Sequence, residues 1–374
     1  MKQQRIAFFL PDLTVGGVQL SIINLCKKLQ NEGYSINLIC GSISGSLIPL
    51  VRGISVIEFK YNRTFKCLPK LFYYVLNQKP DIMISGMNHC NFILLILKIV
   101  FIPSNINTKF ITTIHTNRKL YYEKSKIKEK TIIKINDLII NYSDSIICVS
   151  NGILNEEIKF NPCSIILKKI HVIPNIVIGN NINNLSIRNL ELSKKKIVKF
   201  LYVGRLSYEK NVLQLVHWFY DYIKSNIIFS KNTLTIVGNG PVYTEIKDFI
   251  DFNNLHKSIF LKGYQTNTTQ YYSSHDVLLL NSQYEGLSNV ILEALYNQCI
   301  VVSSNCNYGP YEILKDKYGF LYDIGDKDKF LNIIKKEIFI SNTLYLKHCL
   351  QPYTPNYIYK QYNILFNKLI TNHV

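Results

Sequence analysis

The sequence lacks the features that mark several large classes of protein. Its nine cysteines are scattered, and no two stand in a C-x-x-C spacing. This pattern argues against a zinc site and a disulfide scaffold, and it favours a reducing compartment. The longest apolar run, Phe92 to Ile102, contains Lys98 and is too short to span a bilayer. The apolar run near the start, Ile6 to Leu10, is too short for a signal peptide. We therefore expect a cytoplasmic protein, with peripheral attachment to the inner face of the cell membrane left open.

Several ligand-binding motifs are missing as well. Gly16 and Gly17 lie between the predicted strand Ile6–Leu10 and a predicted helix, Val18 to Gln30, but without the G-x-G-x-x-G or G-K-[ST] spacing. No RRM, KH or helix-turn-helix pattern occurs, so we expect no nucleic-acid partner. The one D-x-D, at Asp326 to Asp328, precedes a predicted helix and is interpreted as a helix cap. The sequence thus predicts neither a metal site nor a cofactor.

What the sequence does contain is typical of a basic, two-domain globular protein. Its 374 residues exceed what one hydrophobic core usually supports, and 47% of them are hydrophobic. The net charge of +18 favours an anionic partner: nucleic acid, a membrane surface or a phosphorylated substrate. An Asn-rich stretch before the lysine run Lys194–Lys196 marks a domain boundary. We expect one domain at residues 1–178, a second at 190–350, and a final helix at 355–372 that packs back on the first domain.

Short apolar runs alternate with helical segments in both halves, which is typical of βαβ units. We therefore predict an α/β fold with two parallel sheets, in which side chains just after the strands are placed to meet ligands. Besides Ile6–Leu10, the predicted strands are Ser35–Cys40, Ser55–Phe59, Pro80–Ser85, Phe110–Ile114, Ser145–Ser150, Ile197–Val203, Leu234–Val237, Ile259–Lys262, Asp276–Asn281 and Ile300–Ser303.

Two features of the first half are candidate functional elements. His115 directly follows a predicted strand, where it could meet a ligand or be a structural histidine. The stretch Arg118 to Lys134 carries seven basic and two acidic residues with apolar ones between them. This pattern indicates either an amphipathic helix that binds an anionic membrane or a helix exposed to solvent.

The second half places two cations around a strand-to-helix loop. Arg205 follows the strand that ends at Val203, and Lys210 precedes the next helix. Such a pair suits a diphosphate, although two exposed cations would look the same in the sequence. Gly238 and Gly240 form a later turn that lets backbone approach a base or ribose, and Tyr264 ends a further strand.

The stretch from Tyr284 to Cys299 contains two carboxylates eight residues apart. Glu285 should lie in a loop after a strand, and Glu293 about one turn into the next helix. The amides at the start of that helix would suit a phosphate. The loop residues between the strand and the helix are Gly286, Leu287 and Ser288, and we expect Gly286 in the turn and Ser288 at the N-cap of the helix.

Taken in order, these pieces resemble the GT-B glycosyltransferases, specifically glycosyltransferase family 4, over essentially the whole chain. The pieces that carry the resemblance are Gly16-Gly17, His115, Ile173-Pro174-Asn175, Gly204-Arg205, Glu209-Lys210, Gly238-Asn239-Gly240-Pro241 and the E-x7-E of Glu285 and Glu293.

The resemblance implies two Rossmann-like domains that face each other across a cleft, the first for the acceptor and the second for a nucleotide-sugar donor. It implies that Arg205 and Lys210 hold the donor diphosphate, that Glu293 binds the ribose, and that Glu285 lies beside the donor sugar. Gly16 and Gly17 would meet the phosphate or sugar from the other domain. His115 would be catalytic or contact the sugar, and transfer would retain the anomeric configuration.

The expected function is therefore transfer of a hexose or N-acetylhexosamine from a UDP-sugar to a growing, lipid-linked glycan in surface polysaccharide biosynthesis. Four residues depart from the family pattern: Gln19, Thr116, Gln298 and Ile300. These departures affect the expected acceptor contacts more than the expected donor binding. A nucleotide-sugar epimerase of similar fold, and a non-catalytic basic module for nucleic acid or anionic lipid, remain as alternatives.

Overall fold

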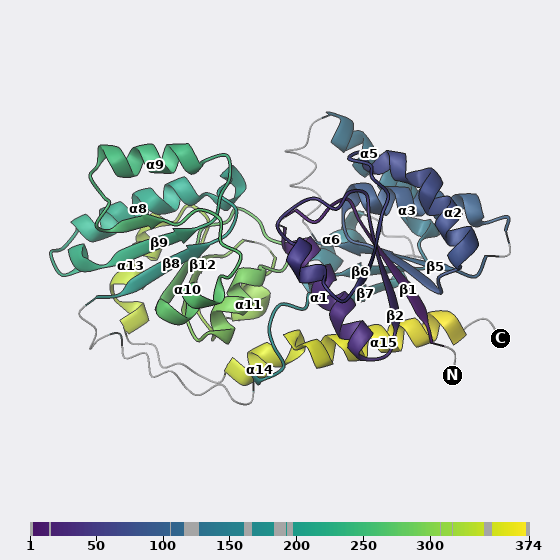
Figure 1. The fold of residues 1–374 in the computed structure, drawn as a ribbon. Helices are drawn as coiled ribbons and strands as arrows, with labels where there is room; N and C mark the ends of the chain where they lie inside the picture. The colour runs from purple at the N-terminus through teal and green to yellow at the C-terminus, as the bar shows by residue number, and fades with distance from the viewer. Residues whose placement is uncertain are drawn as a thin grey trace. The chain divides into compact units, whose positions relative to one another are not determined.

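The computed structural model divides the chain into two compact units (Figure 1). The first unit comprises Met1–Val177 and Tyr353–Val374, and the second comprises Ile178–Pro352. Each unit is built on a parallel sheet, and the predicted α/β class is confirmed. The structure describes residues 3–14, 16–104, 106–115, 127–160, 167–182, 192, 197–306, 308–315, 317–339 and 346–371.

The first unit contains a seven-stranded parallel sheet in the order β3-β2-β1-β4-β5-β6-β7. The order reverses between β1 and β4, because the chain adds strands on one side of β1 and then on the other. The strands are β1 (Arg5–Leu10), β2 (Ser35–Cys40), β3 (Ser55–Glu58), β4 (Ile82–Ser85), β5 (Lys109–Ile114), β6 (Ser145–Cys148) and β7 (Ile170–Val172). The helices are α1 (Gly17–Asn31), α2 (Leu68–Gln78), α3 (Asn88–Phe101), α5 (Ile127–Ile139), α6 (Asn151–Phe160) and α15 (Pro355–Thr371).

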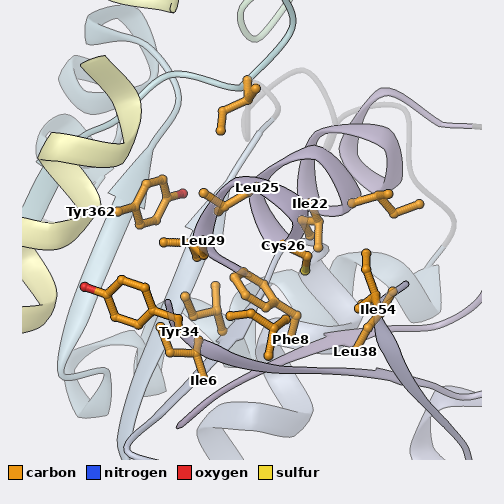
Figure 2. Close-up of a cluster of buried hydrophobic side chains, with 14 of the residues drawn as sticks. Ile6, Phe8, Ile22, Leu25, Cys26, Leu29, Tyr34, Leu38, Ile54 and Tyr362 are labelled. Carbon is orange, nitrogen blue, oxygen red and sulfur yellow. The ribbon is translucent and has the colours of Figure 1, made fainter. Parts of the chain in front are cut away.

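Both faces of the first sheet are buried, which explains why its central strands are apolar without alternation. Ile6 and Phe8 of β1 pack toward α1 and α15, whereas Ala7 and Phe9 pack toward α2 and α3. Figure 2 shows Tyr362 of α15 next to the side chains of α1 in the same cluster.

The C-terminal helix α15 therefore belongs to the first unit, although it follows the second in the sequence. Its Phe366 is fully buried and meets the ring of Tyr34 at a centroid distance of 5.9 Å. The hydroxyl of Tyr34 donates to the Asn363 side chain at 2.7 Å.

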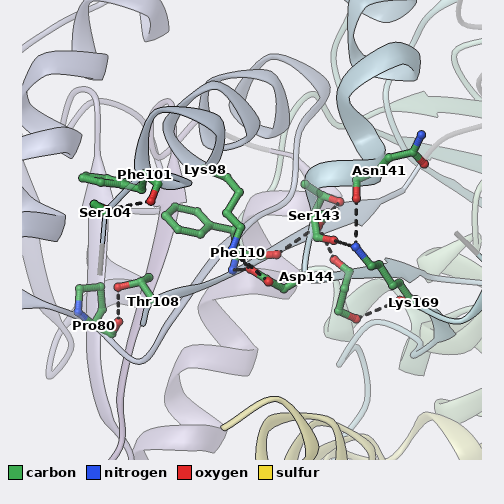
Figure 3. Close-up of polar contacts among 12 residues, drawn as sticks. Pro80, Lys98, Phe101, Ser104, Thr108, Phe110, Asn141, Ser143, Asp144 and Lys169 are labelled. Carbon is green, nitrogen blue, oxygen red and sulfur yellow. Dashed lines mark hydrogen bonds and ion pairs between the residues drawn. The ribbon is translucent and has the colours of Figure 1, made fainter. Parts of the chain in front are cut away.

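Polar contacts fix the amino ends of β5 and β6 (Figure 3). Asp144 accepts from the backbone N–H of Phe110 at 2.8 Å and pairs with Lys98 of α3, also at 2.8 Å. Lys169 donates to the carbonyls of Asn141 and Ser143, which joins the start of β7 to the turn before β6. These contacts hold the amino ends of the strands in place. The candidate residues lie at the opposite, carboxyl edge of the same sheet.

The second unit contains a six-stranded parallel sheet in the order β10-β9-β8-β11-β12-β13. Its strands are β8 (Lys199–Val203), β9 (Thr233–Val237), β10 (Ile259–Leu261), β11 (Val277–Leu280), β12 (Ile300–Ser304) and β13 (Phe320–Tyr322). Its helices are α8 (Val212–Lys224), α9 (Tyr243–Phe252), α10 (Thr269–Ser274), α11 (Asn289–Tyr296), α12 (Pro310–Leu314), α13 (Lys327–Lys335) and α14 (Leu346–Leu350). Helices α8, α9 and α13 cover one face, and α10 and α11 cover the other (Figure 1).

The predicted strands all occur, with ends that differ by up to two residues. Two strands of three residues, β7 and β13, were not predicted. Asp326 caps α13 through its carboxylate, which accepts from the Lys329 N–H at 2.9 Å, so the cap reading of that D-x-D is confirmed. Most of the Arg118–Lys134 stretch lies outside the described residues, and its end forms the first part of α5. Within the described part of the chain, no helix has the length and apolarity needed to span a membrane.

Candidate functional site

The candidate residues of the second unit gather at the point where its strand order reverses. Strands β8 and β11 are neighbours there, so the loops that follow them leave the sheet side by side. The loop after β8 carries Arg205 and Lys210, and the loop after β11 carries Glu285. Lys210 and Glu285 form an ion pair, with Nζ 2.7 Å from Oε1. The exposed guanidinium of Arg205 has no partner among the described residues.

Glu285 is held in one orientation by contacts to a single oxygen. Its Oε1 accepts from the Ser282 hydroxyl and from Lys210, both at 2.7 Å, and its side chain is only 9% exposed. Over the described residues, Oε2 has no hydrogen-bond partner and is not enclosed. One oxygen is thus fixed to the protein, and the other is available to a ligand.

Helix α11 begins at Asn289, shortly after this carboxylate in the chain, and the side chain at its N-cap makes no cap bond. Ser288 occupies the N-cap position with a φ of 36°, in the left-handed region. In that conformation its hydroxyl makes no cap bond, and it is buried without a partner in the described structure. The predicted N-cap position is confirmed, but the usual cap chemistry is absent. The loop also carries Gly286 and Leu287, and Gly309 packs closely over it from the loop after β12.

Glu293 lies on the second turn of α11 and is paired with a tyrosine. The Tyr272 hydroxyl of α10 donates to Oε2 of Glu293 at 2.7 Å. Burial raises the pKa of Glu293, and the hydrogen bond from Tyr272 partly offsets that rise. The other oxygen, Oε1, is neither enclosed nor bonded to any described residue.

Gly238 and Gly240 are required by contacts between loops. A Cβ at Gly238 would lie 1.8 Å from the carbonyl oxygen of Gly204, and one at Gly240 would lie 2.2 Å from that of Leu206. Leu206 also donates its N–H to the carbonyl of Asn239 at 3.0 Å. The turn after β9 therefore packs directly on the turn that carries Arg205, a reason for these glycines that sequence reasoning missed. Their contact with a base or ribose stays a prediction.

Tyr264 follows β10 at the same edge of the second sheet. Its ring is 39% exposed, and it comes directly after Gly263, whose φ is 63°. The Gly263 carbonyl accepts from the N–H of Gly238 at 2.8 Å, which ties the three loops after β8, β9 and β10 together.

The glycines of the first unit lie at the start of α1. Gly17 is the first residue of the helix, and Gly16 is the extended residue before it. A Cβ at Gly16 would lie 2.2 Å from the side-chain oxygen of Gln19, which is buried and folds back over this turn. Gln19, which departs from the family pattern, thus shapes the turn that precedes α1.

His115 follows β5 and is held as a neutral ring. The Thr113 hydroxyl donates its one proton to the Ser85 carbonyl at 2.9 Å, so it can only accept from His115 Nε2, at 2.8 Å. Nε2 therefore carries the ring proton, and Nδ1 is a buried acceptor without a partner among the described residues. Burial lowers the pKa of His115 to about 4, so the ring is uncharged at neutral pH.

Several residues of the site carried no signal in the sequence. Ser282 and Tyr272 become relevant only through contacts with Glu285 and Glu293. Across the ranges that the structure describes, no three His, Cys, Asp or Glu side chains gather as a metal site would require.

Two family models match the chain, one to each half. Residues 15–178 match the model described as Glycosyltransferase Family 4, and residues 184–342 match that described as Glycosyl transferases group 1. An uncharacterized glycosyltransferase of Methanocaldococcus jannaschii is 28% identical over 259 residues, which is 67% of this chain and 61% of that protein. The match thus spans less than two thirds of that relative.

A second relative is matched over most of its length. The Escherichia coli protein named UDP-Gal:alpha-D-GlcNAc-diphosphoundecaprenol alpha-1,3-galactosyltransferase is 27% identical over 343 residues, which is 86% of this chain and 84% of that protein. The crystal structure of Anabaena HepE with UDP and glucose superposes with a TM-score of 0.76 at 17% identity, over 98% of this chain and 100% of that one. That likeness shows the fold. With both halves matched and the fold shared, the chain belongs to the GT-B glycosyltransferases of family 4.

Proposed function

We propose that this glycosyltransferase moves a hexose or an N-acetylhexosamine from a UDP-sugar to a growing glycan, with retention of the anomeric configuration. The observation that carries the proposal is the ion pair of Lys210 and Glu285, which joins the loops after β8 and β11 where the strand order reverses. Arg205 lies in the first of these loops, and Glu293 lies on the helix that follows the second. The donor named for the E. coli relative and the UDP bound to HepE support uracil as the base. The product would belong to a surface polysaccharide.

The chemical demand of this reaction is to stabilise the leaving diphosphate. Negative charge grows on the phosphate as the bond to the sugar breaks, and donors that are already in place stabilise it without reorganising. Arg205 offers a planar fork of donors, Lys210 a point charge, and Ser288 a buried hydroxyl without a partner among the described residues. The start of α11 adds the positive end of a helix. We propose that these groups do the work of a metal ion, so that none is required.

Glu293 and Glu285 would contact different parts of the donor. Oε1 of Glu293 is available to accept from the ribose hydroxyls. Oε2 of Glu285 is available beside the donor sugar, while its other oxygen fixes Lys210. The backbone of Gly286 and Leu287 would contact the diphosphate, and Tyr264 would contact the base.

We assign His115 the role of accepting a hydrogen bond from a sugar hydroxyl. A neutral ring with a bare Nδ1 can accept from a hydroxyl but cannot donate to one at that atom. Gly16 and Gly17 would approach the sugar or a phosphate through their backbone. These assignments follow from the family, and the hydrogen-bonding state of the ring supports the first of them.

The acceptor is proposed to be a lipid-linked glycan at an anionic membrane surface. The E. coli relative is named for a diphosphoundecaprenol acceptor. The charge of this chain is uneven, because the first unit holds 24 basic and 10 acidic residues and the second 19 and 15. The first unit thus carries +14 of the net +18, and we propose that it meets the inner leaflet as a peripheral protein, with Arg118–Lys134 contributing. Binding to vesicles of phosphatidylglycerol that salt abolishes would support this, and equal binding to neutral vesicles would oppose it.

The test of the activity is release of nucleotide from a panel of UDP-, GDP-, ADP- and CDP-sugars in the presence of EDTA. We expect release from a UDP-sugar, and a fall of at least tenfold for Arg205→Ala and for Lys210→Ala. Lys231→Ala, which removes an exposed cation elsewhere in the second unit, serves as the control. Turnover that is unchanged in both site variants would refute the diphosphate assignment.

Two other outcomes would replace the proposal. Conversion of the sugar without transfer would indicate an epimerase, and sugar analysis of the donor pool detects it. Salt-dependent DNA binding without any nucleotide release would indicate a basic binding module.

A further inference from the structure

The pair formed by Glu293 and Tyr272 is more specific than a ribose contact needs. A carboxylate on a helix facing a ligand could be held by packing alone. Here one oxygen of Glu293 is bound at 2.7 Å by a phenol that is itself fully buried. The two residues come from different helices, α11 and α10, and are 21 positions apart in the chain.

The tyrosine can act in one direction only. Burial and the nearby Glu293 raise the pKa of Tyr272 well above its usual value, so the phenol keeps its proton. Its hydroxyl donates to Oε2 of Glu293 at 2.7 Å, and when the carboxylate is ionised the phenol is the only one of the two groups that can donate. A charged acceptor strengthens such a bond, and the bond in turn favours the charged form of the carboxylate.

Tyr272 is in turn held by the elements around it. Its carbonyl accepts from the Cys299 thiol at 3.0 Å. His275, at the end of the same helix, contacts the Tyr271 carbonyl at 2.7 Å and the Thr235 hydroxyl of β9 at 2.8 Å. Helix α10 therefore cannot rotate without breaking contacts to β9 and to Cys299, the residue before β12, so the phenol has a fixed position.

We propose that Tyr272 is a positioning residue for the donor: its hydroxyl keeps Glu293 ionised and turns the free Oε1 outward to the ribose hydroxyls. The inference rests on the proposed function and deepens it. It also makes donor binding depend on pH through Glu293, because only the ionised carboxylate leaves both oxygens as acceptors. The hydrogen bond from Tyr272 thus offsets part of the free-energy cost of keeping a charged carboxylate in a buried place.

Few other titratable groups face this pair. The phenol of Tyr202 on β8 and the Cys299 thiol both act on Tyr272. Burial raises the pKa of Tyr202 well above its usual value, so it stays neutral. Among the described side chains, the remaining elements packed against α11 carry Glu312 on α12, and His348 and Cys349 on α14. The pKa of Glu293 responds first to burial and then to Tyr272.

The experiment compares UDP binding by wild type and Tyr272→Phe, by calorimetry in EDTA at several pH values from 5.5 to 8.5. UDP itself titrates in this range, so the readout is the ratio of the two Kd values at each pH. We expect a ratio of about ten at pH 7, as for loss of a hydrogen bond to a charged group. The ratio should grow as the pH falls, because the pKa of Glu293 is higher without the phenol. With a UDP-sugar, KM should rise while kcat stays within about twofold.

Three controls separate this role from general damage. Tyr271→Phe removes the neighbouring hydroxyl of the same helix, for which the described residues provide no hydrogen bond, and should bind UDP as wild type does. Glu293→Gln should weaken UDP binding with a pH dependence that reflects UDP alone. Adding Tyr272→Phe to Glu293→Gln should leave that pH dependence unchanged.

The outcomes distinguish this inference from the proposal it rests on. If wild type binds UDP and Arg205→Ala weakens binding, yet Tyr272→Phe equals wild type at every pH, the role of Tyr272 is wrong and the donor site stands. A ratio that is raised but constant with pH would show that the phenol orients Glu293 without keeping it ionised, which overturns the second half of the claim. If wild type binds no nucleotide, the proposed function fails and this inference fails with it.

Discussion

Replacing Lys210 with alanine should affect both stability and catalysis, by amounts that the geometry allows us to estimate. The substitution leaves Glu285 only 9% exposed, with Ser282 as its one remaining described partner. Removing one member of a buried ion pair typically costs about 3–5 kcal/mol, because the other charge stays uncompensated. Lys210 is 25% exposed, so water can reach the gap, and we expect a cost of about 2 kcal/mol.

A cost of that size corresponds to a fall in Tm of about 4–8 °C for a unit of this length. The double variant with Glu285→Gln should recover part of it, because the stranded charge is gone, and a double-mutant cycle measures the coupling. Catalysis should behave differently. If Lys210 stabilises the leaving diphosphate, kcat falls by about 10²–10³ in the single variant, and the double variant does not recover it.

The assay is thermal unfolding of the four proteins of the cycle, together with nucleotide release at a saturating UDP-sugar concentration. Lys231→Ala is again the control for loss of one positive charge. A Lys210→Ala protein with kcat within about threefold of wild type would refute the proposed role of this lysine. A double variant no more stable than Lys210→Ala would refute the claim that the uncompensated charge of Glu285 is what destabilises the single variant.

Four further predictions concern other parts of the structure. His115→Ala should lower kcat by about 10²-fold. Wild-type activity should show no titration of this ring above pH 5, because the pKa of His115 is about 4. pH–rate profiles of the two proteins test both expectations. Gly238→Ala should destabilise the second unit by about 3 kcal/mol or more, because the added Cβ would clash with the backbone of Gly204. Gly263→Ala should cost only about 1 kcal/mol, from backbone strain, because its added Cβ would meet no other atom. Urea unfolding of the two variants compares these costs. Phe366→Ala should destabilise the first unit by about 3–5 kcal/mol in the same measurement, although it lies at the far end of the sequence. Glu293→Gln should raise Tm at pH 7, since burial opposes the charged form. That gain should vanish by about pH 4, where the wild-type carboxyl is protonated; Tm measured across the pH range tests the sign.

The sequence was sufficient to predict which residues lie at the carboxyl edges of the sheets. A buried parallel strand is a short apolar run, and the residue after it must lie at that edge, so His115, Arg205 and Glu285 could be placed without coordinates. The strand order could not be predicted, because a βαβ unit can add its second strand on either side of the first. The proximity of Lys210 to Glu285 depends on that order, through the adjacency of β8 and β11.

Two details of the site depend on contacts that no local pattern records. Tyr272 lies on a helix of only six residues, and its partner is on another helix, so periodicity carried no information about it. Ser288 was predicted as an ordinary N-cap. A serine at φ 36° is uncommon, and this backbone conformation turns the hydroxyl away from the amides it would cap. The sequence contains no marker for that conformation.

The glycines after β9 show a different limit of sequence reasoning. A Gly-Asn-Gly turn was read as a place where backbone approaches a ligand. The structure shows that Gly238 and Gly240 approach the backbone of Gly204 and Leu206. Sequence indicated the close approach but not its partner, because the partner lies in another loop of the fold.

The central claim is that the second unit binds a nucleotide diphosphate with its own cations. Calorimetric titration of UDP into the full chain in EDTA, for wild type and for the Arg205→Ala, Lys210→Ala double variant, tests it most directly. We predict binding by wild type without any metal ion and a Kd at least a hundredfold weaker in the double variant. Equal affinity in the two proteins, or wild-type binding that appears only when Mg²⁺ is added, would contradict the account.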